Sequence, residues 1–204
     1  MVKGAFDGIT VLDFTQGIAG PHASMLLALH GADVIKIEPL DGDWGRALGD
    51  IKGDHCAHSI AFNRGKRSIA LDLKSADGRA VVQKLAAKAD VVMESFRPGV
   101  IQRLGFGYED IRKVNPKVIY CSVSGFGQTG PYSKRPTVDG LIQAFSGMMV
   151  MNRMPDGYMA SASGGTGRAT GKMSPSAGSA DLASVAASMP AAEVFKNSRR
   201  ELLI

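Results

Sequence analysis

Apolar residues along the chain come in short runs that alternate with stretches of helical composition. Residues 9–14 are rich in β-branched and large apolar side chains, which is typical of a buried strand. Residues 22–29 have a helical composition, and Gly31 suits the left-handed position that follows a helix. Residues 34–37 have the composition of a second strand. A strand, a helix and a strand at this spacing predict a parallel βαβ unit.

The alternation of strands and helices continues into the middle of the chain. Residues 68–71, 91–93 and 118–122 predict three more strands. Between the first two of them, Ser75 suits the N-cap of a helix that runs to Ala89. Strands that alternate with helices predict an α/β fold with an open, mostly parallel sheet and helices on both of its faces.

The composition of the chain changes near Met159. From there to Pro190 about two thirds of the residues are Ala, Ser, Gly or Thr, without clear periodicity. Such a segment cannot bury enough apolar surface to offset the entropy that ordering removes. We therefore expect a folded domain over residues 1–157 and an irregular or disordered Ala/Ser/Gly-rich tail over residues 158–204. Within that tail, residues 191–204 have the pattern of an isolated amphipathic helix.

Charge and composition narrow the classes of partner. The net charge of +5 and the pI of about 9.3 fit an anionic partner, although many soluble enzymes are mildly basic. No Lys/Arg-rich run and no interleaving of basic with aromatic residues indicates nucleic-acid binding. The start of the chain lacks the apolar region of a signal peptide, and no apolar run approaches the roughly 20 residues that span a membrane. We therefore expect a cytoplasmic protein without a nucleic-acid or membrane partner.

The Cys and His residues do not predict a metal site. Cys56 and Cys121 are far apart and match no metal or redox spacing. His55 and His58 are three residues apart, but no further ligand stands at a suitable spacing. We therefore expect two reduced thiols and no bound metal.

Two glycine-rich segments stand where an open α/β sheet binds ligands. Residues 17–21 (GIAGP) follow the first strand and open the first helix, and helix N-termini at this place bind anions. A tight turn without a ligand is the alternative for these residues. Residues 124–132 contain three glycines and follow the strand at 118–122. The long connection over residues 39–67 is also expected to have a functional or covering role.

Basic residues recur in the loops that follow the predicted strands. These residues are Arg46, Arg64, Lys66, Arg67, Lys74, Arg97 and Arg103. If the loops share one edge of the sheet, the basic side chains form a cationic rim suited to phosphate groups. A scatter of solvated surface charges is the alternative.

Six motifs together carry a resemblance to a known family. They are DGITVLDF at 7–14, AGP at 19–21, GADVIKIE at 31–38, NRGKRSI at 63–69, FRPG at 96–99 and SGFGQTGP at 124–131. In this order and spacing, the chain resembles the family III CoA-transferases from residue 5 to residue 157. The family includes formyl-CoA and carnitine-CoA transferases, with the 2-methylacyl-CoA racemases as relatives.

The resemblance implies a Rossmann-like domain that binds coenzyme A, within a homodimer of interlocked chains. By the resemblance, Gly17, Ile18 and Ala19 would line the thioester end of the ligand. The residues that would contact its adenosine and phosphates are Leu71, Asp72, Leu73, Lys74, Ser95, Phe96, Arg103 and Leu104. Lys and Arg side chains in this set agree with that role, since they offer charge-assisted hydrogen bonds to phosphates.

The resemblance also implies a reaction between an acyl-CoA and a free carboxylic acid. An Asp carboxylate attacks the acyl-CoA carbonyl to give an acyl-enzyme anhydride, the CoA thiolate then forms an enzyme thioester, and the acceptor acid takes the CoA. By the resemblance, Asp139 and Gln16 stand at catalytic positions of the family. In the racemases a His precedes the acidic residue, and Val138 stands there instead, which favours a transferase.

The position that the resemblance gives to the nucleophilic Asp is occupied by Arg168. A cation cannot form the acyl anhydride. Because the composition also changes near this point and the chain ends well short of the family's usual length, we hypothesise a truncated or frameshifted product beyond about Gly157 that is inactive. A non-catalytic CoA-binding remnant and an acyl-CoA racemase-like enzyme are the alternatives.

Overall fold

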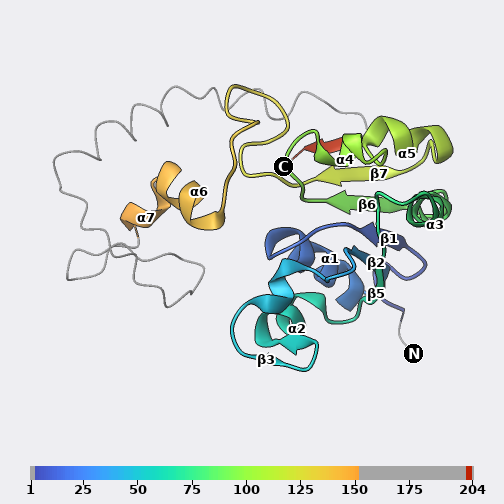
Figure 1. The fold of residues 1–204 in the computed structure, drawn as a ribbon, viewed down its shortest axis with the longest axis horizontal. Coiled ribbons are helices and arrows are strands. Elements are labelled where there is room, and N and C mark those ends of the chain that lie inside the picture. The colour runs from blue at the N-terminus through green and yellow to red at the C-terminus, as the bar shows by residue number, and fades with distance from the viewer. Residues whose placement is uncertain (1–2, 152–200, 204) are drawn as a thin grey trace. The chain divides into compact units, whose positions relative to one another are not determined.

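A parallel sheet organises the first of two units into which the described residues fall (Figure 1). The computed structural model describes residues 3–151 and 201–203 of the 204-residue chain. The first unit comprises residues 1–134 and 199–204, and the second comprises residues 135–198. The described elements of the second unit are α6 (Asp139–Phe145) and α7 (Met148–Met151).

The sheet has six strands in the order β5-β2-β1-β6-β7-β8, and every neighbouring pair is parallel. The strands are β1 (Thr10–Asp13), β2 (Asp33–Glu38), β5 (Arg67–Ala70), β6 (Val91–Glu94), β7 (Ile119–Ser122) and β8 (Glu201–Leu203). Numbered along the chain, they lie in the order 3-2-1-4-5-6, which is an order of doubly wound α/β folds. The predicted open, mostly parallel sheet is confirmed.

Helices pack on both faces of the sheet. They are α1 (Ala19–Leu29), α3 (Ala76–Ala86), α4 (Val100–Arg103) and α5 (Tyr108–Val114). Successive residues of a strand point to opposite faces. Leu12 of β1 belongs to a buried cluster with Val82 of α3 and Ile111 of α5. Its neighbour Val11 belongs to a second cluster, against which Leu27 of α1 packs. The helices therefore cover both faces, as the sequence predicts.

The long connection between β2 and β5 is folded. It contains the short helix η1 (Trp44–Ala47), the hairpin of β3 (Ile51–Lys52) and β4 (His55–Cys56), and α2 (Ala57–Asn63). A capping box starts α2, because Ser59 N donates to Cys56 Sγ and Cys56 N donates to Ser59 Oγ. α2 packs against α1, so the connection is held next to the first βα turn.

Two predicted helix ends are confirmed. Ser75 is the N-cap of α3, and its Oγ accepts a hydrogen bond from Gly78 N at 3.0 Å. Gly31 follows the C-terminal end of α1 with a φ of +104°, a conformation that residues with a Cβ rarely adopt. Both helices thus end or begin where the local residue types favour it.

The last described residues differ from the prediction. The sequence predicts a helix over residues 191–204, but Glu201–Leu203 form β8, which pairs in parallel with β7 through Tyr120 and Glu201. The edge of β7 offers unpaired backbone N–H and C=O groups, and this pairing satisfies them. The rest of the predicted irregular tail, residues 158–200, lies outside the described residues, as does the predicted domain boundary at residue 157.

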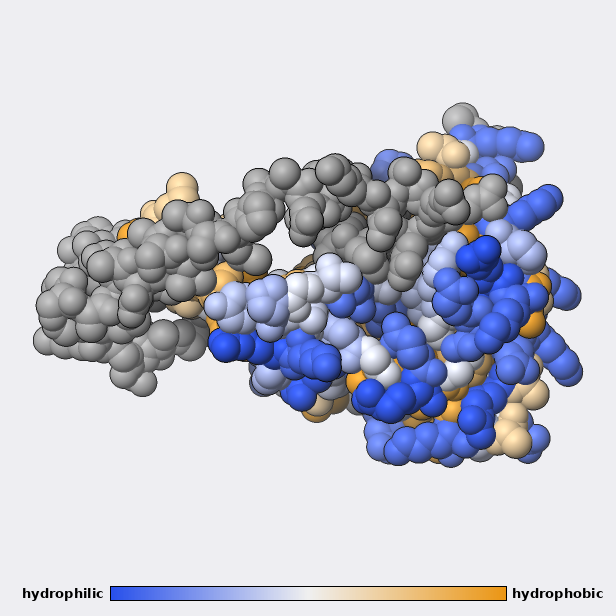
Figure 2. Space-filling model, turned by 90° about the horizontal axis from the view of Figure 1, so that it is seen from above, coloured by the Kyte–Doolittle hydropathy of each residue, from blue (hydrophilic) through white to orange (hydrophobic). Residues whose placement is uncertain are grey.

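One face of the described residues is mostly polar. Figure 2 shows one face on which hydrophilic residues predominate and hydrophobic ones are scattered among them. Isolated apolar side chains are ordinary on the surface of a folded domain. None of the helices within the described residues is both long enough and apolar enough to cross a bilayer.

The stacked pair Phe14 and Phe106 allows a test of the core. Phe106 is fully buried, and the two ring centroids are 5.9 Å apart. We expect Phe106→Ala to lower the free energy of unfolding by about 3–5 kcal/mol, because apolar burial is lost and a cavity is left. Val114→Ala, at a half-exposed position of α5, should change it by less than about 1 kcal/mol. Urea denaturation measures both, and equal losses would contradict the placement of the core.

Candidate functional site

The site begins where the strand order reverses, between β1 and β6. From β1 the chain proceeds to β2 and β5 on one side, and from β6 it proceeds to β7 and β8 on the other. In such sheets, ligands bind in the crevice outside the carboxyl ends of the strands at the reversal. The loops that follow the two strands meet there, because Gln16 N donates a hydrogen bond to Ser95 Oγ at 2.9 Å. The structure therefore brings together two residues that the sequence assigned to the site.

The helix α1 starts directly after the loop that follows β1. Its N-cap residue, Ile18, gives no side-chain hydrogen bond to the first turn. The first N–H groups of a helix have no acceptor within the helix, and the positive end of the helix dipole attracts negative charge. Ile18 and Ala19 therefore stand at a helix end that suits an oxygen-rich or anionic ligand group.

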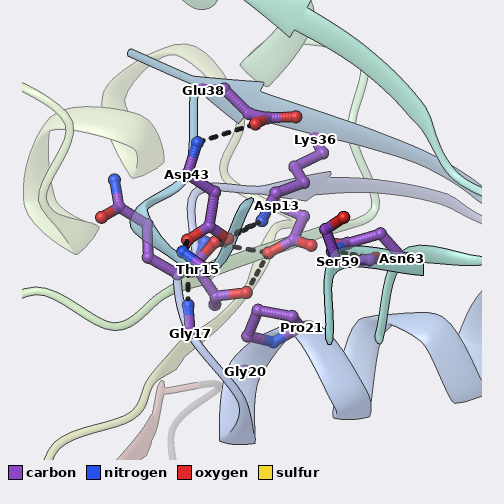
Figure 3. A network of polar contacts seen from close by, with 12 residues as sticks. Asp13, Thr15, Gly17, Gly20, Pro21, Lys36, Glu38, Asp43, Ser59 and Asn63 are labelled. Atoms are coloured by element: carbon purple, nitrogen blue, oxygen red, sulfur yellow. Dashed lines mark hydrogen bonds and ion pairs between the residues drawn. The ribbon is translucent and has the colours of Figure 1, made fainter. Parts of the chain in front are cut away.

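Two buried ion pairs lie beside this loop, and Figure 3 shows Lys36, Asp43 and Asp13, three of their four residues. Lys36 Nζ is 2.9 Å from Asp43 Oδ2, and Lys66 Nζ is 3.0 Å from Asp13 Oδ2, with all four side chains at most 3% exposed. Lys36 Nζ also donates a hydrogen bond to Thr15 O at 2.7 Å. Burial lowers the pKa of Lys66, while the charge of Asp13 acts to raise it. Removing one residue of a pair would leave the charge of the other buried and uncompensated. The two residues of each pair therefore depend on each other.

Asp13, the last residue of β1, holds the loop and α1 together. Its Oδ1 accepts hydrogen bonds from Thr15 N at 2.9 Å and from Thr15 Oγ1 at 2.5 Å. Its Oδ2 accepts from Ser24 Oγ at 2.6 Å and from Lys66 Nζ at 3.0 Å. These four donors fill the acceptor positions of a carboxylate. Asp13 is therefore a structural carboxylate and is not free to act as a nucleophile.

Gly17 lies in a position that leaves no room for a side chain. Its φ is +79°, and a Cβ added to it would lie 2.3 Å from Cζ2 of Trp44. Its N–H donates to Asp43 Oδ1 at 3.2 Å, and its carbonyl accepts from His58 Nε2 at 3.2 Å. The predicted glycine loop is thus held in place by residues of the connection between β2 and β5.

Glu38, at the end of β2, fixes the start of that connection. Arg46 binds it through two parallel hydrogen bonds, Nε to Oε2 and Nη2 to Oε1, both at 2.7 Å. Ser68 Oγ and Asp43 N also donate to it, at 2.5 Å and 2.9 Å. Burial acts to raise the pKa of Glu38, but these hydrogen bonds and the Arg46 charge outweigh it and lower the pKa to about 2. The carboxyl group therefore stays ionised.

The predicted cationic rim is only partly present. Arg46 and Lys66 lie in the ion pairs above, and Arg67 pairs with Asp33 at 2.6 Å. Carboxylates of the protein already bind these three cations, so fewer unpaired charges face a ligand than the predicted rim contains. The rim residues that form no ion pair with any other described residue are Arg64, Lys74, Arg97 and Arg103.

An open cleft of about 280 Å³ lies beside the network, between β2, β5 and α2. Its charged lining residues include Lys36, Glu38, Arg46 and Lys66, all of which have partners within the protein. Most of the charge in this cleft is therefore paired within the protein, and Arg64 is the lining residue whose charge forms no ion pair with another described residue. Within the described residues, no group of three or more His, Cys, Asp and Glu side chains is arranged to hold a metal ion.

Residues 6–186 match the sequence model of one family, CoA-transferase family III. The chain belongs to this family. Acetyl-CoA:oxalate CoA-transferase from Acetobacter aceti is 48% identical to it over 156 residues, which cover 76% of the chain and 40% of that relative. Human succinyl-CoA:glutarate CoA-transferase is 43% identical over 145 residues, which cover 70% of the chain and 33% of the relative. The chain thus spans well under half the length of these curated relatives.

Solved structures related to this family III chain have the same fold over most of its length. A CAIB/BAIF family protein from Brucella suis matches with a TM-score of 0.70 at 42% identity, covering 72% of this chain and 40% of that one. Rv3272 from Mycobacterium tuberculosis matches with a TM-score of 0.70 at 38% identity, covering 77% of this chain and 44% of that one. The α/β fold is therefore shared with these relatives.

The residues expected at adenosine follow β5 and β6 in this family III chain. Leu71 and Leu73 follow β5, Phe96 follows β6, and Leu104 follows α4. All four are partly buried and pack against the same core cluster. Asp72 is exposed, and its Oδ1 accepts a hydrogen bond at 2.8 Å from the N–H two positions on. The loops after β5, β6 and α4 are therefore anchored on the same hydrophobic core. Their contact with coenzyme A stays a prediction.

Asp139, the expected acidic residue of the reaction centre, lies in the second unit. It is the first residue of α6, where a carboxylate is favourable for the helix dipole, and its Oδ2 accepts a hydrogen bond from Gln143 Nε2 at 2.5 Å. Its catalytic role stays a prediction, as does that of Gln16 in the first unit. Arg168, at the expected nucleophile position, lies outside the described residues.

The sequence did not predict the buried ion pairs or the hydrogen bond between His58 and the Gly17 carbonyl. The available signal was Lys36 and Glu38, two charged residues that alternate with the apolar side chains of the second predicted strand and its end. Fully buried charges are rare unless they are paired, so such residues indicate partners elsewhere in the chain. Which partners they have depends on how the connection between β2 and β5 folds, and this could not be inferred from local pattern.

The low pKa of Glu38 predicts a pH-dependent contribution to stability. Because its folded-state pKa of about 2 lies below that of an unfolded Glu, about 4.3, Glu38 stabilises the fold by about 3 kcal/mol above pH 4.3 and loses this as the pH falls towards 2. We expect Glu38→Gln to be less stable than the unmodified protein at pH 7, with a difference that shrinks at pH 3. Urea unfolding at both values measures this.

The matched control for that experiment is Asp33→Asn, which removes an exposed ion pair with Arg67. It should cost about 1 kcal/mol or less. A Glu38→Gln deficit that is the same at pH 3 and pH 7 would contradict the assignment of Glu38 as an ionised anchor.

Proposed function

We propose that this chain carries the coenzyme A-binding part of an enzyme that transfers CoA between an acyl-CoA and a free carboxylic acid. Membership of CoA-transferase family III gives the reaction class. The observation that carries the proposal is the meeting of the Gln16 and Ser95 loops at the strand-order reversal, next to an α1 start without a capping side chain. That combination supports a ligand with phosphate and thioester oxygens.

The residues that we expect at coenzyme A have side chains that suit its parts. Lys74 and Arg103 are exposed and pair with no described carboxylate, so their charges are available to phosphates. Leu71, Phe96 and Leu104 are partly buried and offer apolar surface for the adenine ring. The glycine loop would then take the thioester end. The fold in this proposal is a Rossmann-like domain.

The proposed acceptor is a small carboxylic acid with a second carboxyl group. The relatives from Acetobacter aceti and human carry the substrates oxalate and glutarate in their names, and both are dicarboxylic acids. By the resemblance, we extend the proposal to a homodimer located in the cytoplasm.

A non-catalytic CoA-binding protein is the second candidate, and Arg168 favours it. Transfer needs a carboxylate that attacks the thioester carbonyl and releases CoA as thiolate. An Arg side chain cannot form that anhydride, and Asp13 is fully occupied by four hydrogen bonds. Asp139 is the described carboxylate that the resemblance assigns to the reaction centre.

Binding of coenzyme A to the 204-residue chain tests the first part of the proposal. Calorimetric titration should show saturable binding, which Arg103→Ala should weaken about tenfold or more, because a charge-assisted hydrogen bond to phosphate is lost. Arg112→Ala is the matched control, since Arg112 is exposed on α5 and pairs with Glu109. Absence of binding by a cooperatively folded chain, or equal weakening by both variants, would overturn the assignment.

An assay of CoA transfer separates the two candidates. We expect the chain to form no oxalyl-CoA from acetyl-CoA and oxalate, because Arg168 stands at the position that the resemblance gives to the nucleophile. Mass spectrometry of the products measures this. Turnover above the uncatalysed rate would show that another carboxylate serves, and loss of that turnover in Asp139→Asn would identify it.

A further inference from the structure

Three residues of one segment, the connection between β2 and β5, contact Gly17. Asp43 accepts the Gly17 N–H, His58 donates to the Gly17 carbonyl, and the Trp44 ring occupies the place of a side chain. These three residues are 26 to 41 positions away from Gly17 in sequence. The loop conformation is thus imposed by a distant segment.

The amide side of Gly17 is fixed by a rigid carboxylate. Asp43 is 3% exposed, its Oδ2 pairs with Lys36 at 2.9 Å, and its Oδ1 also accepts from Gly45 N at 2.8 Å. Its own N–H is held by Glu38. Because the Gly17 N–H donates to this carboxylate, it is not available to a ligand.

The carbonyl side of Gly17 is fixed by an aromatic row. The His58 ring lies between Trp44 and Phe62, with centroids 6.5 Å and 4.9 Å away, and Phe62 in turn packs on His22 at 5.8 Å. A carbonyl oxygen can only accept a hydrogen bond. His58 therefore carries its hydrogen on Nε2, and this N–H donates a hydrogen bond to Gly17 O. The row holds the donor in a defined orientation.

Holding the Gly17 carbonyl also orients the next N–H group. The peptide between Gly17 and Ile18 is planar and trans, so its N–H points opposite to its C=O. With the carbonyl directed at His58, the Ile18 N–H is directed away from His58. Among the described residues this N–H has no hydrogen-bond acceptor.

We propose that His58 is a positioning residue for the thioester end of the ligand. Through the Gly17 carbonyl it aims the Ile18 N–H at the place of the acyl carbonyl oxygen. This inference rests on the proposed function, because it takes coenzyme A thioesters as ligands of the loop. It also predicts that the role of His58 depends on a donor at Nε2 and not on charge.

Two substitutions of His58 separate the donor from the bulk of the ring. His58→Gln keeps an N–H donor at a similar reach, whereas His58→Leu keeps apolar bulk between Trp44 and Phe62 but removes the donor. His55→Leu is the matched control, since His55 lies in the same connection, is exposed and contacts Arg46 instead of Gly17. All variants are made in the 204-residue chain.

The first measurement is calorimetric affinity for acetyl-CoA and for free CoA. His58→Leu should weaken acetyl-CoA binding about tenfold, the effect of losing one oriented hydrogen bond to the acyl oxygen. Its affinity for free CoA should stay within about twofold, because free CoA has no acyl carbonyl. His58→Gln and His55→Leu should bind both ligands as the unmodified chain does.

The second measurement is amide hydrogen exchange of the ligand-free chain over residues 16–19, together with the melting temperature. His58→Leu should speed exchange in this segment by about tenfold, because the loop opens more readily, without a matching fall in melting temperature. His58→Gln should restore the slow exchange.

The outcomes distinguish this inference from the proposed function. If the unmodified chain binds neither ligand, the proposed function fails and the inference fails with it. If it binds both and His58→Leu weakens them equally, or if His58→Gln loses as much as His58→Leu, only the positioning role is overturned. A loss that follows the melting temperature would also overturn it, because it would indicate a purely structural role.

Discussion

The buried ion pair between Asp13 and Lys66 is the constraint on which the rest of the site depends. It joins the end of β1 to a residue 53 positions away, at 3.0 Å and with both side chains almost completely buried. The other acceptor positions of Asp13 are used by Thr15 and Ser24, so one carboxylate sets the glycine loop and the first turns of α1. Loss of either charge would leave the other unpaired in the interior, which costs about 3–5 kcal/mol in comparable proteins.

The basic residues of the first unit differ in whether a carboxylate of the protein binds them. Lys36, Lys66 and Arg46 are bound by carboxylates and shape the backbone around the crevice. Lys74 and Arg103 are exposed and pair with no carboxylate in the described part of the chain. A count of basic residues therefore overstates the number of cations available to an anionic ligand, because some of them are paired with carboxylates of the protein.

The sequence predicted the strands and helices well and the buried ion pairs poorly. The physical reason is the separation along the chain of the residues that interact. Strand and helix positions follow from local patterns, and the N-cap at Ser75 and the turn at Gly31 were correct for that reason. Partners of buried charges are decided by tertiary contacts between segments far apart. Arg46 was therefore counted in a possible cationic rim, although it binds Glu38. The strand at 201–203 was missed because three residues carry no periodic signal.

The connection between β2 and β5 limits how this domain can diversify. It supplies Asp43, Trp44 and His58 to a glycine that lies outside it, so the positions of these residues are tied to the loop after β1. Adding or deleting a residue directly beside Asp43 or His58 would shift one contact relative to the other, whereas the exposed hairpin between them can absorb such a change. Variation in ligand preference should therefore come from exchange of side chains in this connection, whereas changes of length are tolerated in the hairpin and elsewhere on the surface.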